Sequence, residues 1–271
     1  MATRTSGPAN VRESYRPGKQ QIGEAAARRG RKADDVIMVA ITRTGTPDEI
    51  RTLAELGHND FGEPRVQQLP QRVTSLSEFL GRKRFLNRGD EAPAPDIRWH
   101  LVGPLPRAKA RQIIPLCRLI HTVDNLRLAE ELHSFGARKS SRDDGDGDEK
   151  PIDILLQVNA TGREDQFGLM MPAVLPVAEQ IDSMMHLRLR GLMVDAPPHC
   201  SSEEARSVYT RVAEHFQEMR SSKYITRHFN ILSMGRSDDF EIAIEEGANI
   251  VRIGKAILGE VDTYSRDRWS R

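Results

Sequence analysis

The chain has 271 residues, enough for one large domain or two small ones, and its 38% of hydrophobic residues can form a sizeable core at this length. Its 40 basic and 39 acidic residues nearly cancel, to a formal net charge of +1, so overall charge gives no argument for binding nucleic acid or an anionic membrane. No apolar run approaches the roughly 18 residues of a membrane span, and Cys117 and Cys200 stand far apart in no metal-ligand spacing, so we expect reduced thiols in a cytoplasmic protein.

The N-terminal segment, residues 1–20, contains no apolar signal core and is predicted to form a flexible arm. Glu13 and the lack of apolar periodicity argue against a transit peptide. From residue 21 onward, short apolar runs alternate with longer amphipathic segments. The runs that predict strands are, in chain order, 36–41, 58–62, 97–103, 119–123, 152–159, 187–194, 229–234 and 249–254.

Amphipathic segments between these runs predict helices that follow the strands. The clearest are 47–57, 125–136, 171–185, 202–222 and 237–247, with plausible C-caps at Gly57, Gly136 and Gly247. Eight strand–helix units within about 220 residues favour an α/β fold, a (β/α)8 TIM barrel, as one domain over residues 21–262. A doubly wound open sheet remains the alternative, because periodicity does not show whether a sheet closes.

Two polar stretches interrupt the pattern, at 81–96 and 137–151. Both are rich in charged residues, Gly and Pro, and both are predicted to be solvated loop insertions. Residues 263–271 are predicted to form a C-terminal tail.

The C-terminal ends of the predicted strands are where a barrel of this kind places its functional site. Polar side chains, glycines and a methionine at or next to these strand ends are therefore the candidates for a site. They are Thr42, Arg43, Glu63, Asn159, Met193, Asp195, Ser233, Gly235, Arg252 and Gly254.

The last two predicted strands end in segments that suit an anion. SMGRSDD, residues 233–239, supplies hydroxyls, a glycine that permits close approach and the start of a helix. RIGKAI, residues 252–257, supplies a second glycine at a strand end, followed by another helix start. Barrels often bind phosphate in the loops after strands seven and eight, so the two segments together predict an anion site.

Arg252 is predicted to point into the barrel, because Val251 and Ile253 share the opposite, apolar face of their strand. A buried guanidinium needs acceptors, either an interior carboxylate or a ligand. His100 and His121 lie within apolar strands and are interpreted as hydrogen-bonded core histidines. No cluster has metal-ligand spacing, and no nucleotide-binding or nucleophile-elbow motif is present.

Several segments, in this order, resemble the pyridoxal phosphate homeostasis proteins, single-domain relatives of the N-terminal barrel of alanine racemase. They include FGEPRVQQ, WHLVGPLPRAKAR, HTVDNLRLAEEL and LSMGRSDDFEIAIEEGANIVRIGKAILG, and the resemblance extends over roughly residues 20–260. It implies a barrel that holds pyridoxal 5′-phosphate at its mouth, with Ser233, Gly235 and the backbone at Gly254 and Lys255 around the phosphate. It also implies that Arg252 faces the pyridine nitrogen. The expected cofactor-binding residues are thus Arg43, Asn159, Met193, Ser233, Gly235, Arg252, Gly254 and Lys255.

One departure from the family affects its chemistry directly. The family's cofactor lysine lies in a segment like V-A-V-S-K-T, and here VAITRT places Arg43 at that position. A guanidinium stays protonated and its nitrogens are delocalised, so no stable Schiff base is expected at residue 43. Lys109 and Lys255 are poor substitutes, since the first lies beyond its strand end and the second belongs beside the phosphate. Further departures are Pro64, Pro106, Ala108 and Gln166.

The resemblance and this departure together predict a non-enzymatic protein that binds pyridoxal 5′-phosphate, or a related phosphate, non-covalently. Alternatively, Arg43 and Arg252 clamp another phosphorylated or anionic metabolite, or Asp195 pairs with Arg43 and neutralises it. A minor alternative is a pyridoxal phosphate-dependent enzyme that uses Glu63, Asp195 or His100 as its acid or base. The expected partner is a small-molecule phosphate, with no nucleic acid or membrane, and we expect a monomer or weak dimer.

Overall fold

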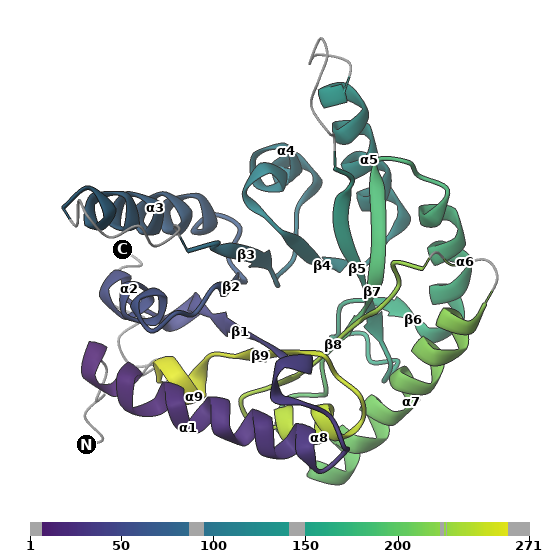
Figure 1. The fold of residues 1–271 in the computed structure, drawn as a ribbon. Helices are drawn as coiled ribbons and strands as arrows, with labels where there is room; N and C mark the ends of the chain where they lie inside the picture. Colours follow the sequence, from purple (N-terminus) through teal and green to yellow (C-terminus); the bar gives the residue numbers. More distant parts are fainter. Residues whose placement is uncertain (1–6, 87–94, 141–149, 223–224, 226, 260–271) are drawn as a thin grey trace, which may run out of the picture.

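Eight parallel strands close into a barrel in the computed structural model, which describes residues 7–86, 95–140, 150–222, 225 and 227–259 (Figure 1). The barrel strands are β1 (Ile37–Ile41), β2 (Asp60–Glu63), β3 (Arg98–Leu101), β4 (Leu119–Val123), β5 (Ile152–Asn159), β7 (Leu187–Val194), β8 (Ile231–Arg236) and β9 (Ile250–Ile253). Each strand pairs with the next in this order, and β9 pairs with β1, where Arg252 lies opposite Val39. The predicted (β/α)8 barrel is therefore confirmed, and the open-sheet alternative is wrong.

The predicted strands match the observed ones closely, and β4, β5 and β7 match at both ends. A further strand, β6 (Leu169–Met170), was not predicted and pairs with the end of β5, where Val158 lies opposite Leu169. Two residues are too few to show an alternating pattern in the sequence.

Helices surround the barrel and follow most strands (Figure 1). They are α1 (Pro8–Ala27), α2 (Pro47–Glu55), α3 (Leu69–Leu86), α4 (Ala110–Ile113), α5 (Leu126–Ser140), α6 (Met171–Asp182), α7 (Ser202–Ser221), α8 (Phe240–Glu245) and α9 (Lys255–Leu258). Thr46 and Ser201 form capping boxes at the starts of α2 and α7. No helix among the described residues is long and apolar enough to cross a membrane.

Three expectations about helix ends and loops need correction. Gly136 lies inside α5 and does not end the helix. A Cβ at this position would lie 2.6 Å from the Cβ of His186, so the glycine is needed for close packing there. Residues 81–86 and 137–140, expected in loops, continue α3 and α5. The remainder of the two expected insertions includes 87–94 and 141–149, which lie outside the described residues, as does the expected tail at 263–271.

The N-terminal segment is also different from its prediction. Residues 8–20 do not form a flexible arm but belong to α1, which packs along the outside of the barrel beside α2, α8 and α9 (Figure 1). Val11, Tyr15 and Ile22 are buried on its inner face. These apolar residues are widely spaced among charged ones, so the helical stripe was too sparse to be recognised from the sequence.

A buried histidine connects α1 to the barrel. The hydroxyl of Tyr15 donates to Nδ1 of His58 at 3.2 Å, and Nε2 of His58 donates to the carbonyl oxygen of Asp60 at 2.7 Å. Both ring nitrogens are therefore used by the neutral imidazole. Burial lowers the pKa of His58 from its ordinary 6.5 to about 4.

Stability is expected to decrease as the pH falls from about 6.5 to 4, because the unfolded chain binds a proton at His58 in this range and the folded protein does not. The loss from this residue should be about 3 kcal/mol. Urea unfolding of the wild type at several pH values measures it. The His58→Gln variant should show a shallower decrease, whereas His228→Gln, at an exposed position, should not. An equal slope in all three proteins would contradict the role of His58.

Candidate functional site

A pocket lies at the mouth of the barrel, where the C-terminal ends of the strands meet. Arg43, Arg252, Gly254 and Lys255 line it, all four of which were predicted to bind the cofactor. Further lining residues are Ile41, Pro64, Val102, Asp195, Pro198, His199, Arg236, Ser237 and Asp238. Among these described residues, the cations Arg43, Arg236, Arg252 and Lys255 outnumber the two carboxylates, Asp195 and Asp238. The pocket therefore favours an anionic ligand.

Hydrogen-bond donors converge on one side of this pocket. The backbone N–H groups of Gly254 and Ala256 donate to Oγ of Ser237 at 3.1 and 3.3 Å. The ammonium of Lys255 lies 3.6 Å from a carboxylate oxygen of Asp238. The hydroxyl of Ser237, which accepts from these N–H groups and keeps its own proton as a donor, can bind a phosphate together with the cation of Lys255.

Ser237 was absent from the predicted binding residues, which included Ser233 instead. The side chain of Ser233 is fully buried inside the barrel and does not line the pocket. Ser233 lies within β8, whereas Ser237 follows the end of that strand. A hydroxyl directly ahead of two acidic residues and a helix start was the available signal for Ser237.

Gly235 also lies away from the pocket lining. Its φ is 89°, and a Cβ there would lie 2.6 Å from the Cβ of Ala243 and 2.8 Å from the Cα of Phe240. The glycine thus allows α8 to pack closely on β8.

Asn159 and Met193, the other two predicted binding residues, do not line the pocket either. The side-chain amide of Asn159 donates to the carbonyl oxygens of Arg163 and Gln166, and its oxygen accepts from the N–H groups of Thr161 and Gly162. Asn159 therefore orders the loop that follows β5. Met193 packs in a small apolar cluster inside the barrel with Val39, Leu119, Leu155 and Ile250.

Arg252 points into the barrel, as its position in the strand predicted, and its side chain is 4% exposed. Its Nη1 donates to Oγ of Ser233 at 2.5 Å, and its Nη2 donates to the carbonyl oxygen of Val194 at 2.9 Å and to Oδ1 of Asp195 at 2.6 Å. Its partner is thus Asp195, so the expectation that Asp195 could pair with Arg43 is wrong. These bonds use three of the five N–H groups of the guanidinium.

A chain of buried side chains continues from Arg252 through the barrel interior. Oγ of Ser233 contacts Nδ1 of His121 at 3.1 Å, Nε2 of His121 contacts Nδ1 of His100 at 2.9 Å, and Nε2 of His100 contacts Oδ1 of Asp60 at 3.1 Å. Burial, followed by the nearby charges of His100 and Arg252, holds the pKa of His121 well below its ordinary value. The interpretation of both histidines as hydrogen-bonded core residues is confirmed.

The end of this network at Asp60 is held by an ion pair. Arg98 donates to both carboxylate oxygens of Asp60, at 2.8 and 2.6 Å. Burial alone would raise the pKa of Asp60, but the hydrogen bonds from Arg98 and His100 outweigh it and hold that pKa well below its usual range. The polar chain therefore extends from the pocket to the opposite end of the barrel and fixes the position of Arg252 from within.

Arg43 lies in the 3-10 turn Thr42–Thr44, directly after β1, and its side chain is exposed in the pocket. Within the part of the chain that the structure describes, it has no hydrogen bond or ion pair. The backbone around it is nevertheless well anchored. Oγ1 of Thr42 donates to Oε2 of Glu63 at 2.6 Å, and the buried Glu63 forms an ion pair with Arg72 at 2.7 Å.

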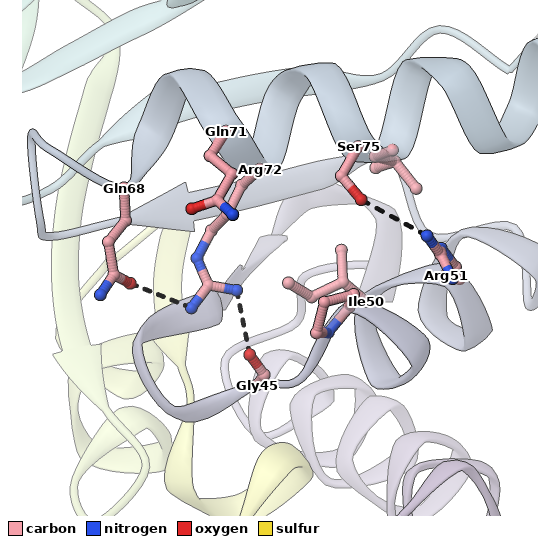
Figure 2. A pocket seen from close by; sticks show the side chains of 9 residues that line it. Gly45, Ile50, Arg51, Gln68, Gln71, Arg72 and Ser75 are labelled. Carbon is pink, nitrogen blue, oxygen red and sulfur yellow. Dashed lines mark hydrogen bonds between the residues drawn. The ribbon is translucent and has the colours of Figure 1, made fainter.

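A groove between α2 and α3 lies next to Gly45, in the segment that carries Arg43 (Figure 2). Figure 2 shows Arg72 in this groove, where it donates to the carbonyl oxygen of Gly45 at 3.0 Å and to Oε1 of Gln68 at 3.2 Å. Arg51 reaches Oγ of Ser75 at 3.5 Å. Because these side chains bind one another and the backbone, we interpret the groove as a support for the Arg43 segment.

The residues considered for acid–base chemistry are all held by other groups. Glu63 is paired with Arg72, His100 is buried between His121 and Asp60, and Asp195 is paired with Arg252. Lys109, the other lysine considered as a nucleophile, does not line the pocket. No group of three or more His, Cys, Asp or Glu among the described residues could hold a metal ion.

Comparison with known proteins places this geometry in context. The family model described as "Alanine racemase, N-terminal domain" matches residues 45–262. The pyridoxal phosphate homeostasis protein of Vibrio cholerae is 31% identical over 91% of this chain and 94% of its own, and that of Escherichia coli is 29% identical over 92% and 95%. The structure of PipY from Synechococcus elongatus with PLP bound has a TM-score of 0.69 and 25% identity, and the match covers 88% of this chain and 100% of that one.

Proposed function

The chain belongs to the alanine racemase N-terminal domain family and, within it, to the pyridoxal phosphate homeostasis proteins, and we propose that it binds pyridoxal 5′-phosphate or a related phosphate without a covalent bond. A single observation carries this proposal. One pocket brings together the donors around Ser237, the buried Arg252 and the exposed Arg43. The PLP-bound structure of the relative PipY supports the same ligand.

The residues at the mouth fit the groups of this cofactor. The hydroxyl of Ser237 and the ammonium of Lys255 would bind the phosphate, and the N–H groups of Gly254 and Ala256, which donate to Oγ of Ser237, would hold that hydroxyl in place. Arg252, which keeps two N–H groups beyond its three bonds inside the barrel, would donate one to the pyridine nitrogen. A guanidinium there leaves that nitrogen unprotonated and makes the ring a weak electron sink.

The missing lysine supports non-covalent binding. Arg43 stands where the resemblance places a Schiff-base lysine, and a guanidinium does not attack an aldehyde at neutral pH. Lys255 lies beside Ser237 at the expected phosphate position, and its ammonium lies 3.6 Å from Asp238, so it is poorly placed to attack the aldehyde.

We propose a non-enzymatic role for the same site. Glu63, His100 and Asp195 are each bound by other side chains, so none is placed as an available general acid or base. As part of this proposal, we place the protein in the cytoplasm, where its two free cysteines would stay reduced. A monomer or weak dimer, with no nucleic acid or membrane partner, stays a prediction.

Calorimetric titration with pyridoxal 5′-phosphate tests the proposal. The Ser237→Ala variant should bind about tenfold more weakly than the wild type, because it loses one charge-assisted hydrogen bond to the phosphate. Ser77→Ala, on the exposed surface of α3, is the matched control and should bind as the wild type does. Borohydride reduction of the wild type should leave no adduct in the intact mass. Failure to bind, or a stoichiometric adduct on one lysine, would contradict the proposal.

A further inference from the structure

We propose that Arg43 makes the pocket selective for a phosphorylated pyridine that carries a carboxylate at the ring position where pyridoxal phosphate carries its aldehyde. This inference rests on the proposed function, since it takes the phosphate and ring positions from it. It adds the chemical class of the preferred ligand, namely an anion at both ends of the molecule.

The first support is that the side chain of Arg43 faces the pocket and is not neutralised by an ion pair with a described residue. Its side chain is exposed in the pocket and, among the residues that the structure describes, has neither a hydrogen-bond nor an ion-pair partner. Its backbone is held by the bonds of Thr42 to Glu63 and of Gly45 to Arg72. A guanidinium on an anchored backbone loses less freedom when it binds a ligand than one on a mobile loop would.

The second support is that the carboxylates of the pocket are used by other cations. Asp195 pairs with Arg252 at 2.6 Å and lies 3.8 Å from Arg236, and Asp238 lies 3.6 Å from Lys255. Neither of the two carboxylates that line the described pocket therefore forms an ion pair with Arg43. The charge of Arg43 is left for a ligand to compensate.

The third support is the match between a guanidinium and a carboxylate. Arginine presents a planar fork of N–H donors that binds both oxygens of a carboxylate, and such charge-assisted pairs are roughly twice as strong as neutral hydrogen bonds. An aldehyde or an alcohol offers one neutral oxygen. A primary ammonium in the same place would be repelled. The chemistry thus predicts the order carboxylate, then aldehyde or alcohol, then amine.

The walls around Arg43 increase this discrimination. Ile41, Pro64 and Val102 line the pocket beside it and are partly buried. Apolar walls lower the local dielectric constant once a ligand excludes water, and this strengthens the attraction between opposite charges. They also offer a surface on which a flat aromatic ring can pack.

Calorimetry with four probes tests the inference: the 5′-phosphates of 4-pyridoxic acid, pyridoxal, pyridoxine and pyridoxamine. The wild type should bind the carboxylate probe at least about tenfold more tightly than the alcohol probe, pyridoxine 5′-phosphate. Arg43→Gln should abolish this ratio and change the affinity for the alcohol probe little. Arg236→Gln removes a cation from the same pocket and is the matched control, which should weaken both probes alike and keep the ratio.

The outcomes separate this inference from the proposed function. If none of the four probes binds, the proposed function fails. If the probes bind but the wild type and Arg43→Gln show the same ratio of affinities, the assignment of a carboxylate to Arg43 is wrong while the proposed function stands. A ratio that falls as much in Arg236→Gln as in Arg43→Gln would show general attraction by the cationic mouth and would also overturn the assignment.

Discussion

Replacing Arg43 with lysine is expected to give a protein that forms one borohydride-stable adduct per chain with pyridoxal 5′-phosphate, where the wild type forms none. The substitution keeps the position of the side chain at the end of β1 and the anchored backbone of Thr42–Thr44. It replaces a delocalised, permanently protonated guanidinium with an amine that can lose its proton and attack an aldehyde. Intact-mass analysis before and after reduction measures the adduct, and peptide mapping locates it.

Two variants serve as controls for this result. Arg43→Gln should form no adduct, because it removes the charge without supplying a nucleophile. Arg43→Lys combined with Ser237→Ala should need a higher concentration of the cofactor to reach the same yield, since the phosphate donors are weakened. An adduct at Lys255 or Lys109 in the wild type, or none in Arg43→Lys, would show that residue 43 does not face the aldehyde.

Replacing Asp153 with asparagine is expected to destabilise the fold by about 3 kcal/mol. Asp153 is buried near the start of β5, and its carboxylate pairs with Arg118 at 2.5 Å, with Arg190 at 3.1 Å and with Arg188. These ion pairs join the segment before β4 to β5 and β7, at the end of the barrel opposite the pocket. Without the carboxylate, three guanidinium groups lie close together with no charge between them.

Thermal and urea unfolding of this variant measure the loss, which should lower the melting temperature by roughly 8 °C for a chain of this size. The matched control is Asp165→Asn, because Asp165 forms an ion pair with Arg163 at 2.8 Å in which both side chains are more than half exposed. It should leave the urea midpoint unchanged, since solvent screens an exposed pair. Equal effects of the two substitutions would refute the role of burial at Asp153.

Much of the barrel could be predicted from hydrophobic patterning. Buried parallel strands are continuous apolar runs, and 119–123, 152–159 and 187–194 matched the observed strands at both ends. The inward direction of Arg252 followed from the alternation of side chains along one strand. The helix α1 was missed because its buried residues are few and lie among charged ones, and only their contacts with α2 and α8 distinguish them.

The candidate site was predictable only where a residue's role depends on its own position in a strand. Arg43, Arg252, Gly254 and Lys255 line the pocket because each lies at or next to the end of its strand, and the sequence shows this directly. Ser237 lines the pocket and Ser233 does not, because β8 ends at Arg236, between them. The pattern of apolar residues does not locate the end of a strand to within one residue.

The sequence by itself thus determined the barrel and the family and placed Arg43 at the end of its first strand, because local pattern and residue identity are enough for each. Only the tertiary structure decided which charges meet. Asp195 pairs with Arg252 and not with Arg43, and Glu63 pairs with Arg72, so neither carboxylate is a partner of Arg43. Ion pairs form between side chains from different strands and helices, and their distances depend on how the whole barrel closes.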